Sequence, residues 1–217
     1  MARQKKLDTF DEKHPKYILD WNDTRDFGED KVYRIVYKDG TKGGWALNYR
    51  NLAQEGDCKI LDEAVCFENG KVFENAVISG NSTVLDNAKI HGNAKAYDNA
   101  CIYDASEVFG DAEVHGHACI SDWAKAYDKA YLGGKAGIGS GAEIFGNAKV
   151  LEEAHVNGKA KIYENAVVRG RAFVSDNSEV FGNAEVAGDA MLQKGGKLGG
   201  DAYLNSFYFH FRNRSSE

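Results

Sequence analysis

The sequence predicts an all-β fold in which the chain coils into a parallel β-helix shaped as a triangular prism. From Lys59 to Ala202 it divides into 24 consecutive six-residue units without insertion or deletion. The second residue of a unit is Ile, Val or Leu in 21 of the 24, and the sixth is Ala, Ser or Gly in all of them. Alternate residues of an extended segment point to the same side, so both positions face inward.

Three units make one coil, so the repeat over residues 59–204 predicts about eight coils of 18 residues. An α-helix needs apolar residues at a spacing near 3.6, which this period excludes. The fifth residue is Asn in ten units. Asn tolerates the left-handed backbone conformation of a tight corner, as do Gly141 and Asp189 at the same position. We therefore expect that conformation at the fifth position.

Residues 1–58 form an N-terminal segment before the repeat. Residues 1–31 are rich in charge and show no clear periodic element. Two apolar runs, 32–37 and one ending at Leu47, flank Asp39-Gly40, which predicts a β-hairpin. An uncapped β-helix exposes an apolar core and unpaired strand edges. We expect this hairpin to cover the first coil.

Residues 205–217 form a C-terminal tail. Phe207, Phe209 and Phe211 alternate with Tyr208 and His210, which predicts a strand with one strongly apolar face. That face needs an apolar surface to pack against.

The aliphatic-x-x-Asn-Ala spacing of units such as Ile90-His91-Gly92-Asn93-Ala94 resembles the hexapeptide repeat of the left-handed β-helix superfamily. Many members are acyltransferases. The resemblance spans residues 59–204 and implies a left-handed parallel β-helix. Upstream, Gly43-Gly44-Trp45, Asn51-Leu52 and Gly56-Asp57-Cys58 resemble the entry segment of an enterobacterial and phage β-helix family that carries a transferase label. That label follows the fold, so it implies little about function.

The composition restricts the partners that we expect. A net charge of −6 argues against a nucleic-acid surface based on general basicity. No apolar run approaches the roughly 18 residues that cross a membrane. The basic first residues are followed by no hydrophobic segment, so we expect no signal peptide. These features predict a cytoplasmic protein whose four cysteines stay reduced.

Positions one and three of each unit point outward, so every third unit contributes to the same flat face. On one face the first positions alternate between Lys and Glu from Lys89 onward, which predicts a ladder of ion pairs. The third positions of that face form an aromatic column. It is either a stacked structural device or a docking stripe for a flat partner such as a base, a sugar or another protein. Its members are Phe73, His91, Phe109, Tyr127, Phe145, Tyr163 and Phe181.

A second face, here named the charge-free face, carries no Asp, Glu, Lys or Arg at its sixteen outward positions. Such a face is usually covered. We expect either a homotrimer, the usual state of the resembled superfamily, or the tail phenylalanines to cover it. The first positions are Val65, Thr83, Cys101, Cys119, Gly137, His155, Phe173 and Met191, and the third positions are Phe67, Leu85, Tyr103, Ser121, Gly139, Asn157, Ser175 and Gln193.

The resembled acyltransferases typically use a histidine as general base, often carry a loop between units, and bind acetyl-CoA or another acyl-CoA between subunits. This chain has no such loop. His155 is the candidate base and Asn157 the residue that would orient it. A notch formed by Cys119, Ser121, Gly137 and Gly139 would receive the ligand. The alternative is an interface histidine in a glycine-lined dent.

We expect no metal site. His115 and His117 lie on a flat face and in a corner respectively, and no third histidine matches them. The sequence thus favours a non-catalytic, rigid scaffold without a cofactor that acts through its flat surfaces. It would be a phage or bacterial accessory protein whose protein partner the sequence does not identify. The alternative is an acyltransferase that uses acyl-CoA at an inter-subunit site.

Overall fold

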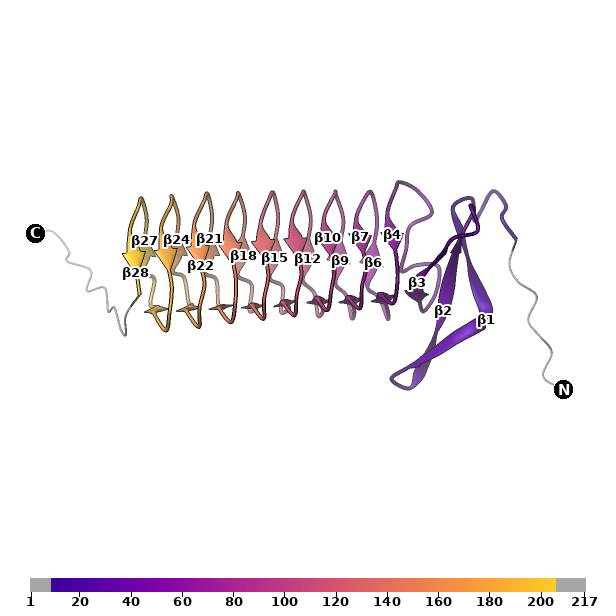
Figure 1. Ribbon diagram of the computed structural model, residues 1–217, viewed down its shortest axis with the longest axis horizontal. Coiled ribbons are helices and arrows are strands. Elements are labelled where there is room, and N and C mark those ends of the chain that lie inside the picture. Colours follow the sequence, from indigo (N-terminus) through magenta and orange to yellow (C-terminus); the bar gives the residue numbers. More distant parts are fainter. Residues whose placement is uncertain (1–8, 206–217) are drawn as a thin grey trace, which may run out of the picture.

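The computed structural model describes residues 9–205 and confirms an all-β fold of stacked parallel coils (Figure 1). The strands of the coils recur in turn on three sheets. Sheet 1 begins with β1 (Tyr17–Phe27), β2 (Asp30–Tyr37) and β3 (Lys42–Ala46) and continues with β5 (Val65–Cys66), β8 (Thr83–Val84), β11 (Cys101–Ile102), β14 (Cys119–Ile120), β17 (Gly137–Ile138), β20 (His155–Val156), β23 (Phe173–Val174) and β26 (Met191–Leu192).

Sheets 2 and 3 complete the prism. Sheet 2 consists of β4 (Lys59–Ile60), β7 (Val77–Ile78), β10 (Lys95–Ala96), β13 (Glu113–Val114), β16 (Tyr131–Leu132), β19 (Lys149–Val150), β22 (Val167–Val168), β25 (Glu185–Val186) and β28 (Tyr203–Leu204). Sheet 3 consists of β6 (Lys71–Val72), β9 (Lys89–Ile90), β12 (Glu107–Val108), β15 (Lys125–Ala126), β18 (Glu143–Ile144), β21 (Lys161–Ile162), β24 (Glu179–Val180) and β27 (Lys197–Leu198).

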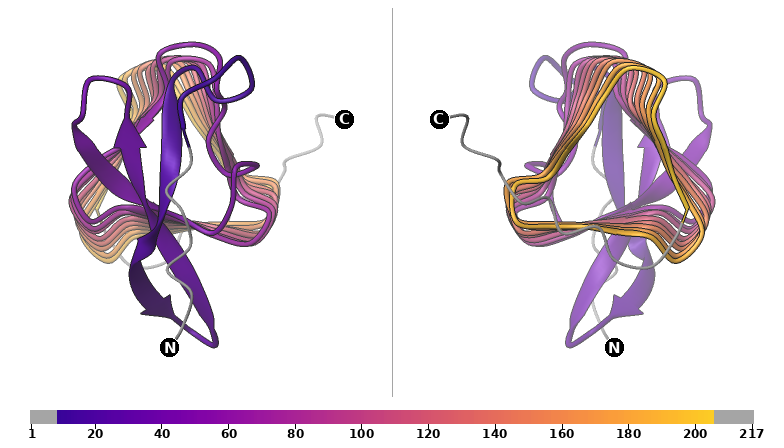
Figure 2. Two further views of the ribbon diagram at one scale, coloured as in Figure 1. Left: turned by 90° about the vertical axis from the view of Figure 1, so that its right-hand side faces the viewer. Right: turned by 90° about the vertical axis from the view of Figure 1, so that its left-hand side faces the viewer.

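Each coil repeats the register of the one before it. Cys101 pairs with Cys119, and Glu107 pairs with Lys125, one 18-residue coil further along the chain. The end-on views show the triangular cross-section that three units per coil produce (Figure 2). About nine coils are stacked, one more than the repeat alone predicted. The left hand of the coil stays a prediction from the resemblance.

The core is a narrow column along the axis of the prism. The aliphatic second residues from Ile60 to Leu192 are buried, as are the small sixth residues from Ala64 to Gly196. The inward assignment of these two positions is therefore confirmed. Residues at the first and third positions are half-buried or exposed along most of the prism, so the coils present three nearly flat surfaces.

The left-handed backbone lies at the fourth position of the unit, and our expectation for the fifth was wrong. All 24 fourth residues have positive φ, from Asp62 (φ 54°) to Gly200 (φ 65°). At the fifth position only Trp123, Gly141 and Gly195 adopt it, and all three follow strands of sheet 1.

Fifth-position Asn residues instead stack along a corner. The Asn75 amide donates to Asn93 Oδ1 at 3.1 Å, and the Asn93 amide donates to Asp111 Oδ1 at 2.9 Å. Side-chain ladders between coils therefore explain these asparagines.

The predicted hairpin is present, because β2 and β3 pair antiparallel on either side of the Asp39-Gly40 turn. Strand β1, which the sequence did not indicate, pairs antiparallel with β2, with a register shift between Asp20 and Thr24. The hairpin of β1 and β2 lies across the N-terminal end of the prism (Figure 2). Its Tyr17 and Tyr37 side chains belong to the same buried cluster as the core of the coils.

Residues 43–58 form the additional coil. Strand β3 pairs in parallel with β5, and Leu52 forms a parallel bridge to Val72. One strand thus joins the antiparallel hairpin to the parallel coils. The predicted tail strand with Phe207, Phe209 and Phe211 lies outside the described residues.

Candidate functional site

The hairpin covers the N-terminal end of the charge-free face. Val65 and Phe67, its first row, are only 2% and 9% exposed. They form a buried cluster with Val32 of β2 and Trp45 of β3, against which Phe27 packs. Leu85 of the next row packs against this cluster, and no residue of the rows from β11 to β26 belongs to it.

All six residues that the sequence placed around the notch line one hollow of about 290 Å³ on sheet 1. Gly139 is buried at its floor, and the Ser121 and Asn157 side chains come closest to the place where a Cβ on Gly139 would lie. Asp122 and Lys135, which the sequence did not indicate, also line the hollow. They occupy corner positions of their units, so a search restricted to flat positions does not find them.

The His155 side chain is exposed, and its ring lies over Gly137. A Cβ on Gly137 would come within 2.6 Å of His155 Nδ1, so glycine is what leaves room for the ring. Among residues 9–205, neither nitrogen of His155 has a hydrogen-bond partner, and Asn157 does not bond to it. A general base needs a group that fixes its tautomer and orientation. The catalytic role of His155 and the orienting role of Asn157 stay predictions.

Cys119 lines the hollow, and Cys101 lies in register with it on the adjacent strand. The Cys101 and Cys119 thiols share a hydrogen bond, which lowers the pKa of Cys101, and Thr83 Oγ1 also donates to Cys101 Sγ at 3.3 Å. The same shared bond raises the pKa of Cys119. Hydrogen bonds to a thiolate favour its charged form. Thr83 thus supplies a donor that favours the thiolate form of Cys101.

The aromatic column on sheet 3 is a continuous stack. Successive ring centroids lie between 4.5 Å and 5.4 Å apart, with planes within 10° of parallel. Its interpretation as a structural device fits these contacts, and its role as a docking stripe stays a prediction. The column runs from Phe73 through His91, Phe109, Tyr127, Phe145 and Tyr163 to Phe181.

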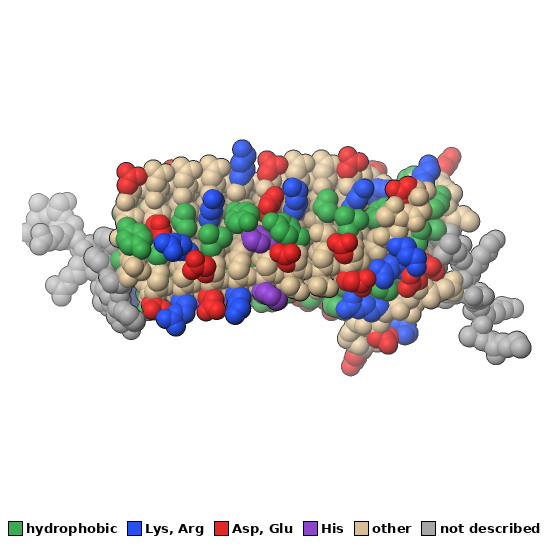
Figure 3. All heavy atoms as spheres, in the orientation of Figure 1, with side chains coloured by type: hydrophobic (Ala, Val, Ile, Leu, Met, Phe, Trp, Pro, Cys, Tyr) green, Lys and Arg blue, Asp and Glu red, His purple; other side chains and the backbone are tan. Residues whose placement is uncertain are grey.

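The carboxylates beside the column bind both the rings and the ladder lysines. Glu107 lies 3.2 Å from His91 Nε2 and 3.3 Å from Lys125 Nζ. The Tyr163 hydroxyl donates to Glu179 at 3.1 Å, and Glu179 pairs with Lys197 at 2.8 Å. The bond from Lys197 lowers the pKa of Glu179. Acidic and basic side chains are likewise interspersed along the surface shown in Figure 3.

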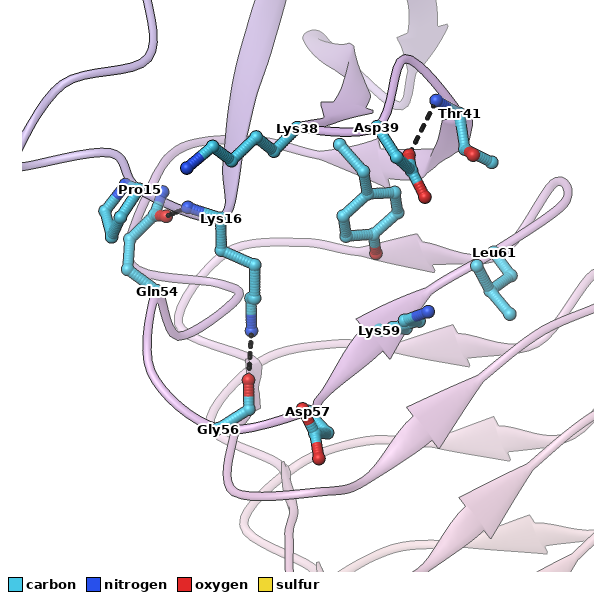
Figure 4. Close-up of a pocket in the computed structure, with 11 residues that line it drawn as sticks. Pro15, Lys16, Lys38, Asp39, Thr41, Gln54, Gly56, Asp57, Lys59 and Leu61 are labelled. Atoms are coloured by element: carbon cyan, nitrogen blue, oxygen red, sulfur yellow. Dashed lines mark hydrogen bonds between the residues drawn. The ribbon is translucent and has the colours of Figure 1, made fainter.

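A further hollow of about 490 Å³ lies where the hairpin meets the coils (Figure 4). Lys16 Nζ donates there to the carbonyl oxygens of Gly56 at 3.4 Å and Cys58 at 3.1 Å. The Tyr37 hydroxyl donates to Ile60 O at 3.0 Å and accepts from Ile60 N at 2.8 Å. Burial raises the pKa of Tyr37. These bonds fasten the hairpin to the first coils.

The two histidines that were considered as metal ligands, His115 and His117, have different surroundings. The His115 ring stacks on Tyr97 at 5.1 Å and contacts Tyr131, while His117 is exposed in a corner. Within residues 9–205, no three His, Cys, Asp or Glu side chains are grouped so that they could hold a metal ion.

The class of protein that the structure defines is a β-solenoid of parallel coils. No model of a protein family matches the chain, and no curated protein matches it either. Membership of the hexapeptide-repeat superfamily therefore stays a prediction. The part of the chain that the structure describes contains no helix that is long and apolar enough to cross a membrane.

Proposed function

We propose that this protein is a non-catalytic, rigid scaffold that assembles with copies of itself through the charge-free face. The observation that supports this is the stretch of sheet 1 from β11 to β26. Phe173 and Met191 are half-buried there within a single chain, and none of the outward flat positions is charged. Uncharged flat surfaces with aromatic and methionine side chains are typical of the interior of subunit interfaces.

A second copy of the chain is the occupant that fits best. The first row of the same face is already buried under the hairpin, which supports packing of this face against protein. A rigid prism with one uncharged side can close around a three-fold axis, so we propose a homotrimer. Its setting would be the bacterial or phage cytoplasm, and its function would be to present the charged faces to a protein partner.

Light scattering tests the assembly directly. We expect a mass about three times that of the 23.8 kDa chain, stable on dilution to low micromolar concentration. A monomer at every concentration would contradict self-assembly through this face.

The alternative, an acyltransferase, is favoured by one observation, the hollow that joins His155, Ser121 and Cys119. A donor such as acetyl-CoA would lie between subunits, and the neighbouring subunit would have to supply a partner for His155. A true donor site raises Tm when ligand greatly exceeds Kd. We therefore compare the melting of the wild type with and without acetyl-CoA.

The His155→Ala variant decides between the two functions. For a scaffold, we expect acetyl-CoA to leave Tm unchanged and His155→Ala to assemble like the wild type. Acyl transfer by the wild type that is lost in His155→Ala, without loss of assembly, would replace the scaffold with the enzyme.

A further inference from the structure

Three basic side chains gather at the N-terminal end of sheet 3. Lys71 of β6 and Lys89 of β9 are paired in register on adjacent strands, and Arg50 precedes the same coil. This is the single like-charge step in a column that alternates in sign from Lys89 to Lys197. Like charges directly opposite each other on a sheet are destabilising. The repulsion between Lys71 and Lys89 would be relieved by an anion bound between them.

The described residues supply no such anion. Within residues 9–205, the side chains of Arg50, Lys71 and Lys89 have no ion pair or hydrogen bond. Glu107 is in register with Lys89, but its carboxylate binds Lys125 and His91 instead. All three cations are exposed. They are therefore free to bind a ligand, and they form a local basic cluster although the net charge of the chain is −6.

Two hollows share these three cations. One, of about 300 Å³, is also lined by Asn69 and Asn87, whose amides can donate hydrogen bonds to an anion. The other, of about 620 Å³, extends to Phe73 and His91 of the aromatic column and to Glu107, whose carboxylate is held by Lys125 and His91. An anion bound by the cations would therefore lie beside the first ring of the stack.

Within residues 9–205, that first ring has a ring neighbour on one side only. Phe73 stacks on His91 at 4.5 Å and has no other ring neighbour among the described residues, whereas the rings from His91 to Tyr163 have one on each side. The preceding coil carries Ala53 in register with Phe73, since Leu52 is bridged to Val72. Alanine is too small to cover the ring. The hollow thus has an aromatic wall next to its cations.

We propose that this end of the aromatic column binds a small organic phosphate that carries a planar ring, such as a nucleoside monophosphate. The phosphate lies among Arg50, Lys71 and Lys89, because guanidinium and ammonium groups form charge-assisted hydrogen bonds with phosphate oxygens. The ring extends the stack on Phe73, because every base has a π face that can stack on an aromatic side chain. The site lies on sheet 3, so it does not depend on assembly through sheet 1.

Isothermal titration calorimetry with adenosine monophosphate, inorganic phosphate and adenosine tests the site. We expect adenosine monophosphate to bind at least about tenfold more tightly than either part alone, because both the cations and the ring contribute. Lys71→Gln and Lys89→Gln should each weaken its binding by about tenfold or more. Lys161→Gln removes another exposed lysine from the same ladder and should change binding by less than about twofold.

Phe73→Leu separates stacking from charge. It should abolish the preference for adenosine monophosphate over inorganic phosphate while phosphate binding persists. The proposal is overturned if adenosine monophosphate shows no saturable binding up to about 10 mM, which corresponds to a binding free energy weaker than about 3 kcal/mol. It is also overturned if Lys161→Gln weakens binding as much as Lys71→Gln, or if Phe73→Leu leaves the preference unchanged. Circular dichroism of each variant checks that the coils remain folded.

Discussion

Two buried serines occupy the sixth position of equivalent units on sheet 1. One of them is hydrogen-bonded and the other is not. Ser106 Oγ lies 2.8 Å from Tyr103 O and 3.1 Å from Ile120 O. Ser178 Oγ is also buried but has no partner. An unsatisfied buried hydroxyl loses its bonds to water without compensation, so it destabilises the fold. Most units place Ala at this position, which avoids that cost.

The two serines should respond in opposite directions to alanine. We expect Ser178→Ala to raise the free energy of unfolding by about 1 kcal/mol, because it removes an unpaired hydroxyl. Ser106→Ala should lower it by about 1 kcal/mol, because it removes a satisfied bond. Urea unfolding of the two variants measures both changes. Equal shifts of the same sign would show that the hydrogen bonds do not distinguish the two positions.

Some features of single residues in the repeat were predictable from the sequence, and others were not. Which residues face inward followed from the period alone. The corner conformation did not, because Asn at the fifth position suggested positive φ there. The better signal was the fourth position, which is Asp, Glu or Gly in 22 of 24 units. Its acids serve a second purpose, since Asp62 Oδ2 accepts from Gly80 N one coil further along. That contact is visible only when the coils are stacked.

At the scale of elements, each coil is one layer of a narrow core. The ion-pair ladders on its outer faces contribute little to the free energy of unfolding. Ile120 is fully buried, whereas Lys125 is nearly half exposed and pairs with Glu107 at 3.3 Å. We expect Ile120→Ala to lower the free energy of unfolding by about 2–5 kcal/mol, since a stacked prism collapses poorly around a cavity. Lys125→Ala should cost less than about 1 kcal/mol. Similar losses in urea unfolding would contradict the inward and outward assignment.

The hairpin is the element that the sequence predicted least completely. Strand β1 was missed because only its first three residues, Tyr17 to Leu19, are buried; the rest is polar and lacks an alternating pattern. Its pairing with β2 makes it a strand. The hairpin of β2 and β3 was predictable because a turn sequence separates two apolar runs. The union of β3 with the coils could not be predicted, since it depends on parallel pairing across a loop.

The Tyr37 hydroxyl of β2 fastens the N-terminal hairpin to Ile60 of the coils. Tyr37→Phe would leave the Ile60 amide and carbonyl without their bonds to that hydroxyl in a buried environment, so we expect a loss of about 1–3 kcal/mol. Tyr33→Phe is the control, because its hydroxyl makes no hydrogen bond among the described residues. Thermal unfolding of both variants measures the effect. Equal stability of the two would mean that the bonds to Ile60 do not hold the hairpin in place.

At the scale of the whole molecule, regularity makes the fold predictable and the function hard to predict. One rule repeated 24 times specifies the core, so the fold could be read from the chain. That the notch residues are neighbours could also be predicted, because residues 18 apart in the sequence lie on adjacent strands. What a partner would contribute could not be predicted, since among residues 9–205 His155 has no orienting group and the hairpin does not reach the charge-free face from β11 onward.

Cys119 lies in the middle of that uncovered stretch, so Cys119→Arg tests what covers it. A charge placed in a desolvated interface without a partner costs several kcal/mol, roughly 3–5 by analogy with broken buried ion pairs. If copies of the chain cover the face, light scattering should show a trimer for the wild type and a monomer for Cys119→Arg. Cys119→Ser keeps the size of the side chain and should remain trimeric.

The competing cover is the tail, residues 205–217. In that case the wild type and Cys119→Arg both run as monomers, and truncation after Asn205 uncovers the face and promotes aggregation. The trimer and the tail therefore differ in the mass of the wild type as well as in the effect of truncation. If Cys119→Arg changes neither mass nor stability and truncation is harmless, the face is exposed to solvent and the assembly proposal fails. We expect the trimer, because the uncovered rows continue along the prism as far as β26, a flat surface long enough for a second rigid prism to match.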